Sequence, residues 1–356
     1  MTERPPLSQT IPPLLLGSAT FNSQYNKSPF NLPFTSIIRH FLSSSPKVGF
    51  DTSPYYGPAE ILLGHSLKLL SPPRNTYFLA TKIGRIASSE FDYSPEWIRR
   101  KFVSFDEVIS AVNTLRELRS EGKIDYIGIS GYPVDILSQT AERIYKITGE
   151  GLDAVMSYSN YTIQNTRLAS NGLQRLTKGG KVGCVINASL LGMGLLRTQG
   201  VPVGDMGDFH PSSDGLRKVC NDAAGFVASK GKKLEEVAYR WALENWADEG
   251  RVAGTSILPR EEGKKVGVSV IGVSYLEELE SILSTWEDVV KAREGDKDAV
   301  ERRKENDDLV EELKGVFGEW YDDIWKSPGE DYVREEVKPE RLLDDEELWP
   351  EMKLLK

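Results

Sequence analysis

The sequence predicts an α/β protein, a TIM-barrel-like (β/α)8 fold that lacks one βα unit, the fourth strand. Three observations support this class. Short apolar runs alternate with longer stretches of helical spacing, polar side chains close two of those runs, and only seven strand candidates are found where a complete barrel has eight. At 356 residues with 39 % apolar composition, the chain is long enough to bury the core of such a barrel.

The strand candidates are apolar runs bounded by turn residues, over residues 13–20, 47–53, 76–82, 124–131, 152–159, 182–190 and 266–273. Apolar residues at helical spacing predict helices between them, over residues 34–44, 59–70, 105–121, 134–147, 164–178, 214–230 and 233–247. The stretches 192–212 and 248–265 break the alternation and are predicted to be surface loops at strand ends.

Two parts of the chain differ in composition. Residues 11–290 are predicted to form the barrel domain, and residues 291–356 a charged C-terminal helix and tail. A helix packed on the outside of the barrel is favoured over a coiled coil, because the thin apolar stripe shows no sustained heptad; its residues are Val300, Leu309, Leu313 and Val316. Residues 320–332 are predicted to fold back onto the body of the protein.

Composition and charge exclude several classes of function. The net charge of −9 disfavours a nucleic-acid partner. Two cysteines, Cys184 and Cys220, cannot form a disulfide framework and have no metal-ligand spacing around them, so we expect no metal and a reducing compartment. No apolar run is long enough to cross a bilayer and the N-terminus has no apolar signal core. We therefore expect no membrane partner, a cytoplasmic location, and a monomer or a weak dimer.

Three side chains suggest proton-transfer chemistry. Asp51 closes one apolar run, Lys82 closes the next, and Tyr56 lies on the turn that follows Asp51. The carboxyl ends of parallel barrel strands share one rim, so these side chains can converge. A lysine held by an aspartate would favour the phenolate form of a neighbouring tyrosine, which could then exchange a proton with a carbonyl or alcohol oxygen during hydride transfer.

The motif around these residues resembles a known family. The stretch "FDTSPYYGPAEILLGHSL" resembles the D-T-A-x-x-Y-G signature of the aldo-keto reductases, with Ser53 in the alanine place. The resemblance continues through "LATK", "LRELRSEGKIDYIGISGYP", "NASLLGMGLL" and "IGVSYLEELESIL", and so covers most of residues 11–290. The branch it is most similar to is that of the NAD-dependent D-arabinose and L-galactose dehydrogenases, as "FDYSPEWIRR" and "SYSNYTIQN" suggest.

Site residues follow from this resemblance position by position. It implies that Tyr56 is the catalytic acid/base, that Lys82 tunes it and that Asp51 supports Lys82. It implies a cofactor site that includes Thr20, Ser130, Ser157, Ser189, Leu191, Gly192, Gly194, Gly272, Val273, Ser274 and Glu278. Gly272 and Glu278 stand where NADP-preferring members place basic residues, so NAD is expected rather than NADP. Gly131 and Ala188 replace residues that usually contact the nicotinamide.

One part of the family pattern is missing. The family has a further catalytic residue, a histidine at the end of the fourth strand, and the three histidines of this chain, His40, His65 and His210, lie elsewhere. The stretch between Lys82 and Gly122 has helical character and no strand-like run. Relative to the family pattern, we expect that a block ending in the histidine is removed at Arg100–Lys101, either by a skipped exon or by evolutionary loss.

The sequence thus supports one main function and two alternatives. The first is a dehydrogenase that oxidises the anomeric hydroxyl of D-arabinose or a similar aldose to its lactone, with a small sugar as its only partner. The second is a catalytically impaired relative that binds the nucleotide or serves regulation. The third is a regulatory subunit of the potassium-channel β type, which shares the fold. Without the histidine, we expect turnover to fall by about 10²–10³.

Overall fold

The computed structural model describes residues 4–83, 85–87, 90–91, 105–204, 207, 209–256 and 264–325, so the junction predicted at residues 100–101 lies outside the described residues. Among the described residues the chain divides into two compact units. The first holds residues 4–15, 118–271 and 277–325, and the second holds residues 16–117 and 272–276. The predicted boundary at residue 290 stays a prediction.

The main sheet has seven strands, and every predicted strand is confirmed. In sheet order they are β3 (Tyr77–Ala80), β2 (Val48–Asp51), β1 (Leu14–Gly17), β11 (Val268–Gly272), β8 (Cys184–Ala188), β7 (Ala154–Tyr158) and β6 (Gly128–Gly131). The registers are parallel for β2 with β3, β6 with β7, β7 with β8 and β8 with β11. This is the order of a (β/α)8 barrel without its fourth strand, so the fold class is confirmed.

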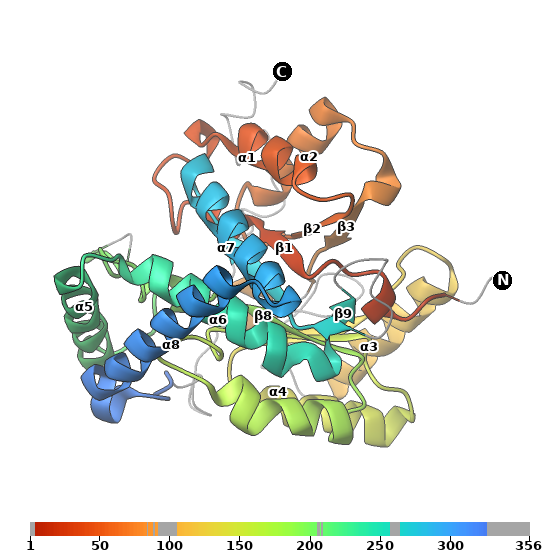
Figure 1. Ribbon diagram of the computed structural model, residues 1–356. Helices are drawn as coiled ribbons and strands as arrows, with labels where there is room; N and C mark the ends of the chain where they lie inside the picture. Colours follow the sequence, from red (N-terminus) through yellow and green to blue (C-terminus); the bar gives the residue numbers. More distant parts are fainter. Residues whose placement is uncertain are drawn as a thin grey trace. The chain divides into compact units, whose positions relative to one another are not determined.

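The second unit packs two helices beside β1–β3. Helix α1 (Phe34–Ser43) and helix α2 (Ala59–Leu70) lie next to each other (Figure 1), joined by a hydrogen bond between the hydroxyls of Thr35 and Ser66. The apolar face of α1 is buried, and the ring of Phe41 meets that of Phe50 on β2 edge to face. Helix and strand therefore share one core, which fixes the carboxyl end of β2.

The first unit carries the remaining helices. They are α4 (Val134–Thr148), α5 (Asp214–Ser229), α6 (Leu234–Glu249), nearly all of α7 (Leu276–Glu294) and α8 (Lys297–Phe317). Helix α3 (Phe105–Ser120) crosses from one unit to the other along the chain. The helix predicted over 164–178 is present in altered form, as two π-helical stretches, Leu168–Gly172 and Arg175–Gly179. No helix in the described part of the chain has the length and apolarity needed to cross a membrane.

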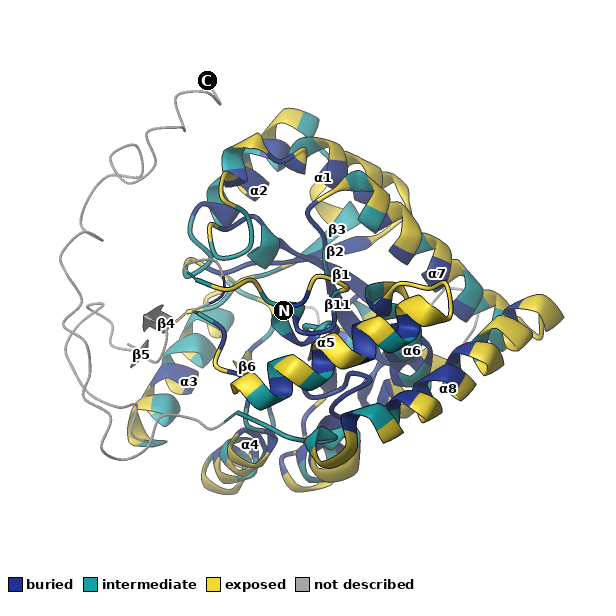
Figure 2. Cartoon of the chain, turned by 90° about the vertical axis from the view of Figure 1, so that its left-hand side faces the viewer, coloured by how far each residue is buried: buried dark blue, intermediate teal, exposed yellow. Residues whose placement is uncertain are grey.

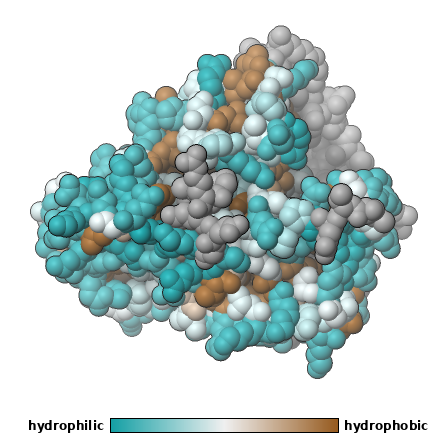
Figure 3. Space-filling view, turned by 45° about the vertical axis from the view of Figure 1, so that its right-hand side comes forward, coloured by the Kyte–Doolittle hydropathy of each residue, from teal (hydrophilic) through white to brown (hydrophobic). Residues whose placement is uncertain are grey.

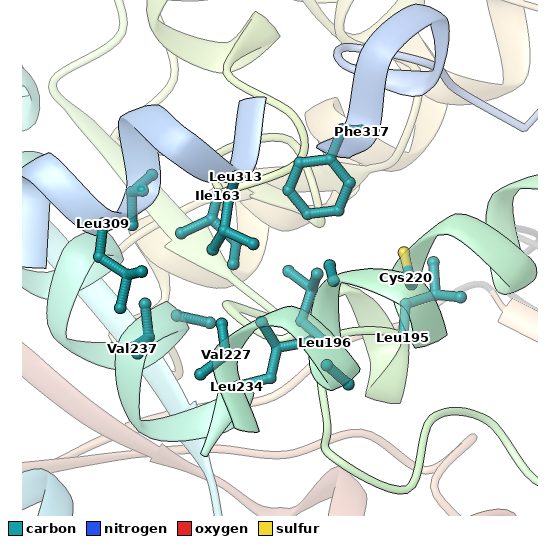
Figure 4. Packing of buried hydrophobic residues seen from close by; sticks show 14 of the residues in the cluster. Ile163, Leu195, Leu196, Cys220, Val227, Leu234, Val237, Leu309, Leu313 and Phe317 are labelled. Atoms are coloured by element: carbon teal, nitrogen blue, oxygen red, sulfur yellow. The ribbon is translucent and has the colours of Figure 1, made fainter. Parts of the chain in front are cut away.

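Helix α8 packs against other helices of the first unit. Its buried stripe faces α5 and α6, and its opposite face is exposed (Figure 2). Figure 4 shows Leu309, Leu313 and Phe317 directed toward the side chains of α5 and α6. One stripe residue was wrongly predicted: Val300 is 47 % exposed, because the buried stripe begins at Ala299 and continues through Leu309.

Two short antiparallel strand pairs were not predicted. Strands β4 (Arg85–Ala87) and β5 (Glu90–Phe91) pair antiparallel in a stretch predicted to have no strand-like run. Strands β9 (Thr255–Ser256) and β10 (Lys265–Val266) pair antiparallel, within and just after the predicted loop 248–265. Val266 is buried, and buried backbone N–H and C=O groups need hydrogen-bond partners.

The described surface is largely polar. On the face shown in Figure 3, hydrophilic residues predominate and apolar residues lie in small separate patches. Scattered apolar residues of this kind are normal for a protein surface. Function must therefore be sought in the polar groups that the strand ends bring together.

Candidate active site

An ion pair joins the ends of β2 and β3 in the second unit. Because β2 and β3 are parallel and Asp51 pairs in register with Ala80, Lys82 follows β3 at the same edge as Asp51. The Lys82 Nζ donates to both carboxylate oxygens of Asp51, at 2.6 and 2.7 Å, and to the carbonyl of Thr52 at 3.0 Å. These acceptors fix the position of the ammonium.

The turn after β2 presents Tyr56 to this ammonium. The Tyr56 N–H donates to the carbonyl of Ser53, and the Tyr55 N–H donates to the hydroxyl of Ser53. Pro54 takes the second position of this turn, which its fixed φ favours, and Gly57 follows with a left-handed φ of 57°. As a result, Lys82 Nζ lies 4.9 Å from the centroid of the Tyr56 ring.

Burial and the neighbouring charge have opposite effects on the pKa of each member of the ion pair. Burial raises the pKa of Asp51, and the neighbouring Lys82 charge only partly offsets this. Burial alone would lower the pKa of Lys82, but attraction to Asp51 and Tyr56 outweighs it and the pKa is raised. Lys82 is therefore held as an ammonium beside the phenol. A cation in that place stabilises negative charge on Tyr56, which is what a tyrosine needs in order to accept or donate a proton.

Asp51→Asn tests the energy of this pair. Asp51 is almost fully buried and the Lys82 side chain is 20 % exposed, so removing the carboxylate leaves a buried ammonium without its partner. We expect a loss of about 3 kcal/mol in the free energy of unfolding, measured by urea denaturation at neutral pH. The double variant Asp51→Asn/Lys82→Met should recover part of that loss, and equal losses in the single and double variants would contradict the ion-pair explanation.

The turn after β11, in the same unit, gathers four more predicted site residues. Thr20 Oγ1 donates to the carbonyl of Val273 at 2.7 Å, and a Cβ added to Gly272 would lie 3.2 Å from the methyl of Thr20. Asn26, which the sequence did not single out, donates to the carbonyl of Thr20 and to the hydroxyl of Ser274. The segment after β1 is thereby tied to the start of α7.

The loop after β8, in the first unit, is built from left-handed residues. Ser189, Gly192, Met193 and Gly194 have φ values of 55°, 58°, 57° and 105°. For the serine and the methionine this conformation costs on the order of 1–2 kcal/mol each, so the surroundings must hold it. Leu195 and Leu196, immediately after the loop, do so in the core cluster shown in Figure 4, together with residues of α5, α6 and α8.

This loop has the backbone donors that a phosphate group requires. Within the part of the chain that the structure describes, the amide N–H groups of Leu190, Leu191 and Met193 donate to no acceptor. Leu190 is 1 % exposed, so its amide is buried as well as unpaired. The free amides of Leu190 and Leu191 are consecutive, and that of Met193 follows the Gly192 amide, which donates to the carbonyl of Ser189. Free amides in a left-handed turn can form a concave anion site, so the residues present fit the pyrophosphate of a nicotinamide dinucleotide. Sugar phosphates of other kinds would use the same donors.

A histidine that the sequence did not assign to the site lies behind this loop. His210 is 3 % exposed, and its Nε2 is 2.9 Å from the carbonyl oxygen of Gly192. Burial lowers the pKa of His210 to about 4; the bond to Gly192 opposes that shift and the charge of Arg217 adds to it. The signal in the sequence is weak, because His210 lies in a loop with no periodic pattern.

His210 predicts a loss of stability in mild acid. The unfolded chain takes up a proton near the ordinary pKa of 6.5, whereas the folded chain stays neutral down to about pH 4. The unfolded state therefore binds more protons in this interval, and stability falls as the pH falls through it. Between pH 7 and pH 5 we expect the wild type to lose about 2 kcal/mol more than His210→Gln in urea denaturation. Parallel losses in the two proteins would show that His210 does not titrate as described.

The other predicted site residues of the first unit fall in different places. Ser130 on β6 pairs in register with Met156 and is exposed, whereas Ser157 points to the opposite face of the sheet and is fully buried. The Ser157 hydroxyl accepts from the side chain of Asn160 at 2.9 Å. The structure therefore does not bring these two serines together. Glu278 on α7 forms an ion pair with Arg197, at 3.2 Å, just after the β8 loop.

No group of three or more histidine, cysteine, aspartate or glutamate side chains suited to a metal ion is found among the described residues. The parallel strand order, with a lysine–aspartate pair and a tyrosine at two neighbouring strand ends, defines a class of fold: a (β/α) barrel that lacks one unit. The sequence matches the profile of the Aldo/keto reductase family over residues 13–107 and 103–296, and the chain belongs to that family.

Two characterised relatives belong to one branch. The chain is 35 % identical over 350 residues to D-arabinose 1-dehydrogenase of Saccharomyces cerevisiae, with 89 % of this chain and 94 % of the relative covered. It is 34 % identical over 272 residues to L-galactose dehydrogenase of Arabidopsis thaliana, with 67 % and 82 % covered. A thermostable aldo-keto reductase of known structure aligns with a TM-score of 0.44 and 18 % identity, covering 78 % of this chain and 90 % of its own.

Proposed function

We propose that this chain is an NAD-dependent sugar dehydrogenase that oxidises the anomeric hydroxyl of D-arabinose or a similar aldose to the lactone. The observation that carries this proposal is the fixed Lys82 ammonium, which is held by Asp51 and lies beside the ring of Tyr56. The names of the two relatives, both dehydrogenases of aldoses, support the substrate class.

The chemistry assigns each residue one task. NAD, when bound, supplies the acceptor for the hydride that leaves the anomeric carbon. Tyr56, as the phenolate, accepts the proton of the anomeric hydroxyl while the electron pair of the C–H bond leaves as hydride and the C=O bond forms. Lys82 stabilises the phenolate, and Asp51 keeps Lys82 charged and in place. Tyr56 then returns its proton to water.

NAD is proposed over NADP because of the negative charge of Glu278 on α7. Glu278 is a carboxylate at the place where the resemblance locates basic residues of NADP-preferring members. A carboxylate repels a 2′-phosphate but can accept a hydrogen bond from a ribose hydroxyl. The ion pair with Arg197 holds Glu278 in position. A cytosolic location is part of the proposal, supported by Cys184 and Cys220, which are both free and buried.

Turnover is proposed to be slow, because no histidine occurs between Lys82 and Gly122. The same observation favours the second candidate, a nucleotide-binding relative without turnover. One experiment separates the two: the purified chain is given D-arabinose with NAD or NADP, and NADH binding is titrated by fluorescence. Steady formation of NADH, faster with NAD, supports the dehydrogenase, whereas saturable NADH binding with no turnover supports the second candidate and contradicts the first.

A further inference from the structure

The hydrogen bonds of His210 define which of its ring nitrogens carries the proton. The backbone N–H of Ser212 donates to Nδ1 at 3.1 Å, so Nδ1 has a lone pair and no hydrogen. The ring proton of the neutral imidazole therefore sits on Nε2. That nitrogen lies 2.9 Å from the carbonyl oxygen of Gly192, to which it donates. His210 thus contacts the β8 loop through one peptide carbonyl, that of Gly192.

The same peptide group carries a free donor on its other side. In a trans peptide the C=O and the following N–H point in opposite directions, and the described chain has no cis peptide bond. When His210 holds the Gly192 carbonyl, the N–H of Met193 points away from the imidazole. That N–H donates to no acceptor among the described residues, and Met193 is held in the left-handed region at φ 57°.

His210 is held both through its backbone carbonyl and through its ring. Arg217 on α5 donates to the carbonyl of His210 at 2.8 Å, to that of Gly207 at 3.0 Å and to the hydroxyl of Ser212 at 3.1 Å. The ring of Trp325 meets the imidazole edge to face, with centroids 5.1 Å apart, and stacks on Tyr132 at 4.1 Å. A histidine fixed in this way can hold a strained loop in one conformation.

We propose that His210 is a positioning residue, which orients the Gly192–Met193 peptide so that the Met193 N–H is presented to the phosphate bridge of the nicotinamide cofactor. This inference rests on the proposed function, because it assigns the cofactor to the β8 loop. His210 itself does not contact the cofactor in this account. Its effect should therefore appear in the binding of any ligand that carries the same pyrophosphate.

Three substitutions at one position separate the donor from the rest of the side chain. His210→Gln can keep an N–H donor near the place of Nε2, His210→Asn keeps polar atoms only near Nδ1, and His210→Leu keeps neither. The dissociation constants of NADH and ADP-ribose are measured by calorimetry on the full chain, with thermal denaturation as a check on folding. His40→Gln, at an exposed histidine of α1, is the matched control.

We expect His210→Leu and His210→Asn to bind both ligands about tenfold more weakly than the wild type, and His210→Gln to stay within about twofold. Hydrogen exchange should show that NADH protects the segment around Met193 in the wild type and in His210→Gln but not in His210→Leu. A folded His210→Leu that binds both ligands as the wild type does, or a His210→Gln as weak as His210→Leu, overturns the inference alone. A wild type that binds neither ligand overturns the proposed function as well.

Discussion

Tyr56→Phe is expected to lower the rate of NAD-dependent aldose oxidation by about 10²–10⁴, the usual contribution of a general acid or base. The substitution removes only the phenolic oxygen and leaves the ring beside Lys82, whose Nζ lies 4.9 Å from the ring centroid. The Asp51–Lys82 pair and the β8 loop should be unaffected. The dissociation constant of NADH should therefore stay within about twofold of the wild type.

The matched control for this prediction is Tyr55→Phe, since Tyr55 is the neighbouring residue of the same turn and carries the same phenol. It should retain the wild-type rate. If Tyr55→Phe lost activity and Tyr56→Phe kept it, the assignment of Tyr56 as the acid/base would be wrong. A loss of NADH binding in Tyr56→Phe would show instead that the Tyr56 hydroxyl maintains the cofactor site, rather than acting only in proton transfer.

Restoring the missing βα unit is expected to raise turnover by about 10²–10³. The family profile matches this chain in two parts, residues 13–107 and 103–296, which meet near the junction at Arg100–Lys101. The insertion would supply a strand that ends in a histidine, as the family pattern described above expects at this place. A histidine at a strand end supplies a donor for the substrate oxygen, and the new strand would offer a pairing partner to an edge strand of the sheet.

The strand and the histidine can be tested separately. The same insertion with its histidine replaced by alanine should stabilise the chain against urea but leave turnover near that of the chain without the insertion. Sequencing the transcript between the codons for Arg100 and Lys101 shows whether such a segment is naturally read. If a folded insertion variant that binds NADH and contains the histidine turned over no faster than the present chain, slow turnover could not be attributed to that residue.

Much of the fold could be predicted from the sequence, because strands and helices here have strong local patterns. All seven strands of the main sheet were found from apolar runs, and α8 from its charge and thin apolar stripe. Hairpins such as β9–β10 were missed, because a strand of two residues has no periodicity to detect. The π-helical turns between residues 168 and 179 were missed for a similar reason, since they differ from an α-helix only in hydrogen bonding.

A site residue could be predicted where it lies at the end of a strand, but not where it lies in a loop. Asp51 and Lys82 meet because parallel strands end at one edge, which the sequence order already implies. His210 reaches Gly192 across eighteen positions of irregular chain, and Asn26 reaches Ser274 from a distant segment. Such contacts depend on tertiary structure, and no local pattern encodes them. The opposite orientations of Ser130 and Ser157 likewise depend on strand register.

The central claim is that Tyr56, with Lys82 and Asp51, removes a proton from an aldose while hydride passes to NAD. The most direct test incubates the chain in excess over NAD with D-arabinose that carries deuterium at its anomeric carbon, and follows the label by mass spectrometry. The account predicts that deuterium appears in the reduced nicotinamide with the wild type and that its appearance is greatly slowed with Tyr56→Phe. Deuterium that stays on the sugar although NADH binds to the wild type, or an equal transfer rate in both proteins, would contradict it.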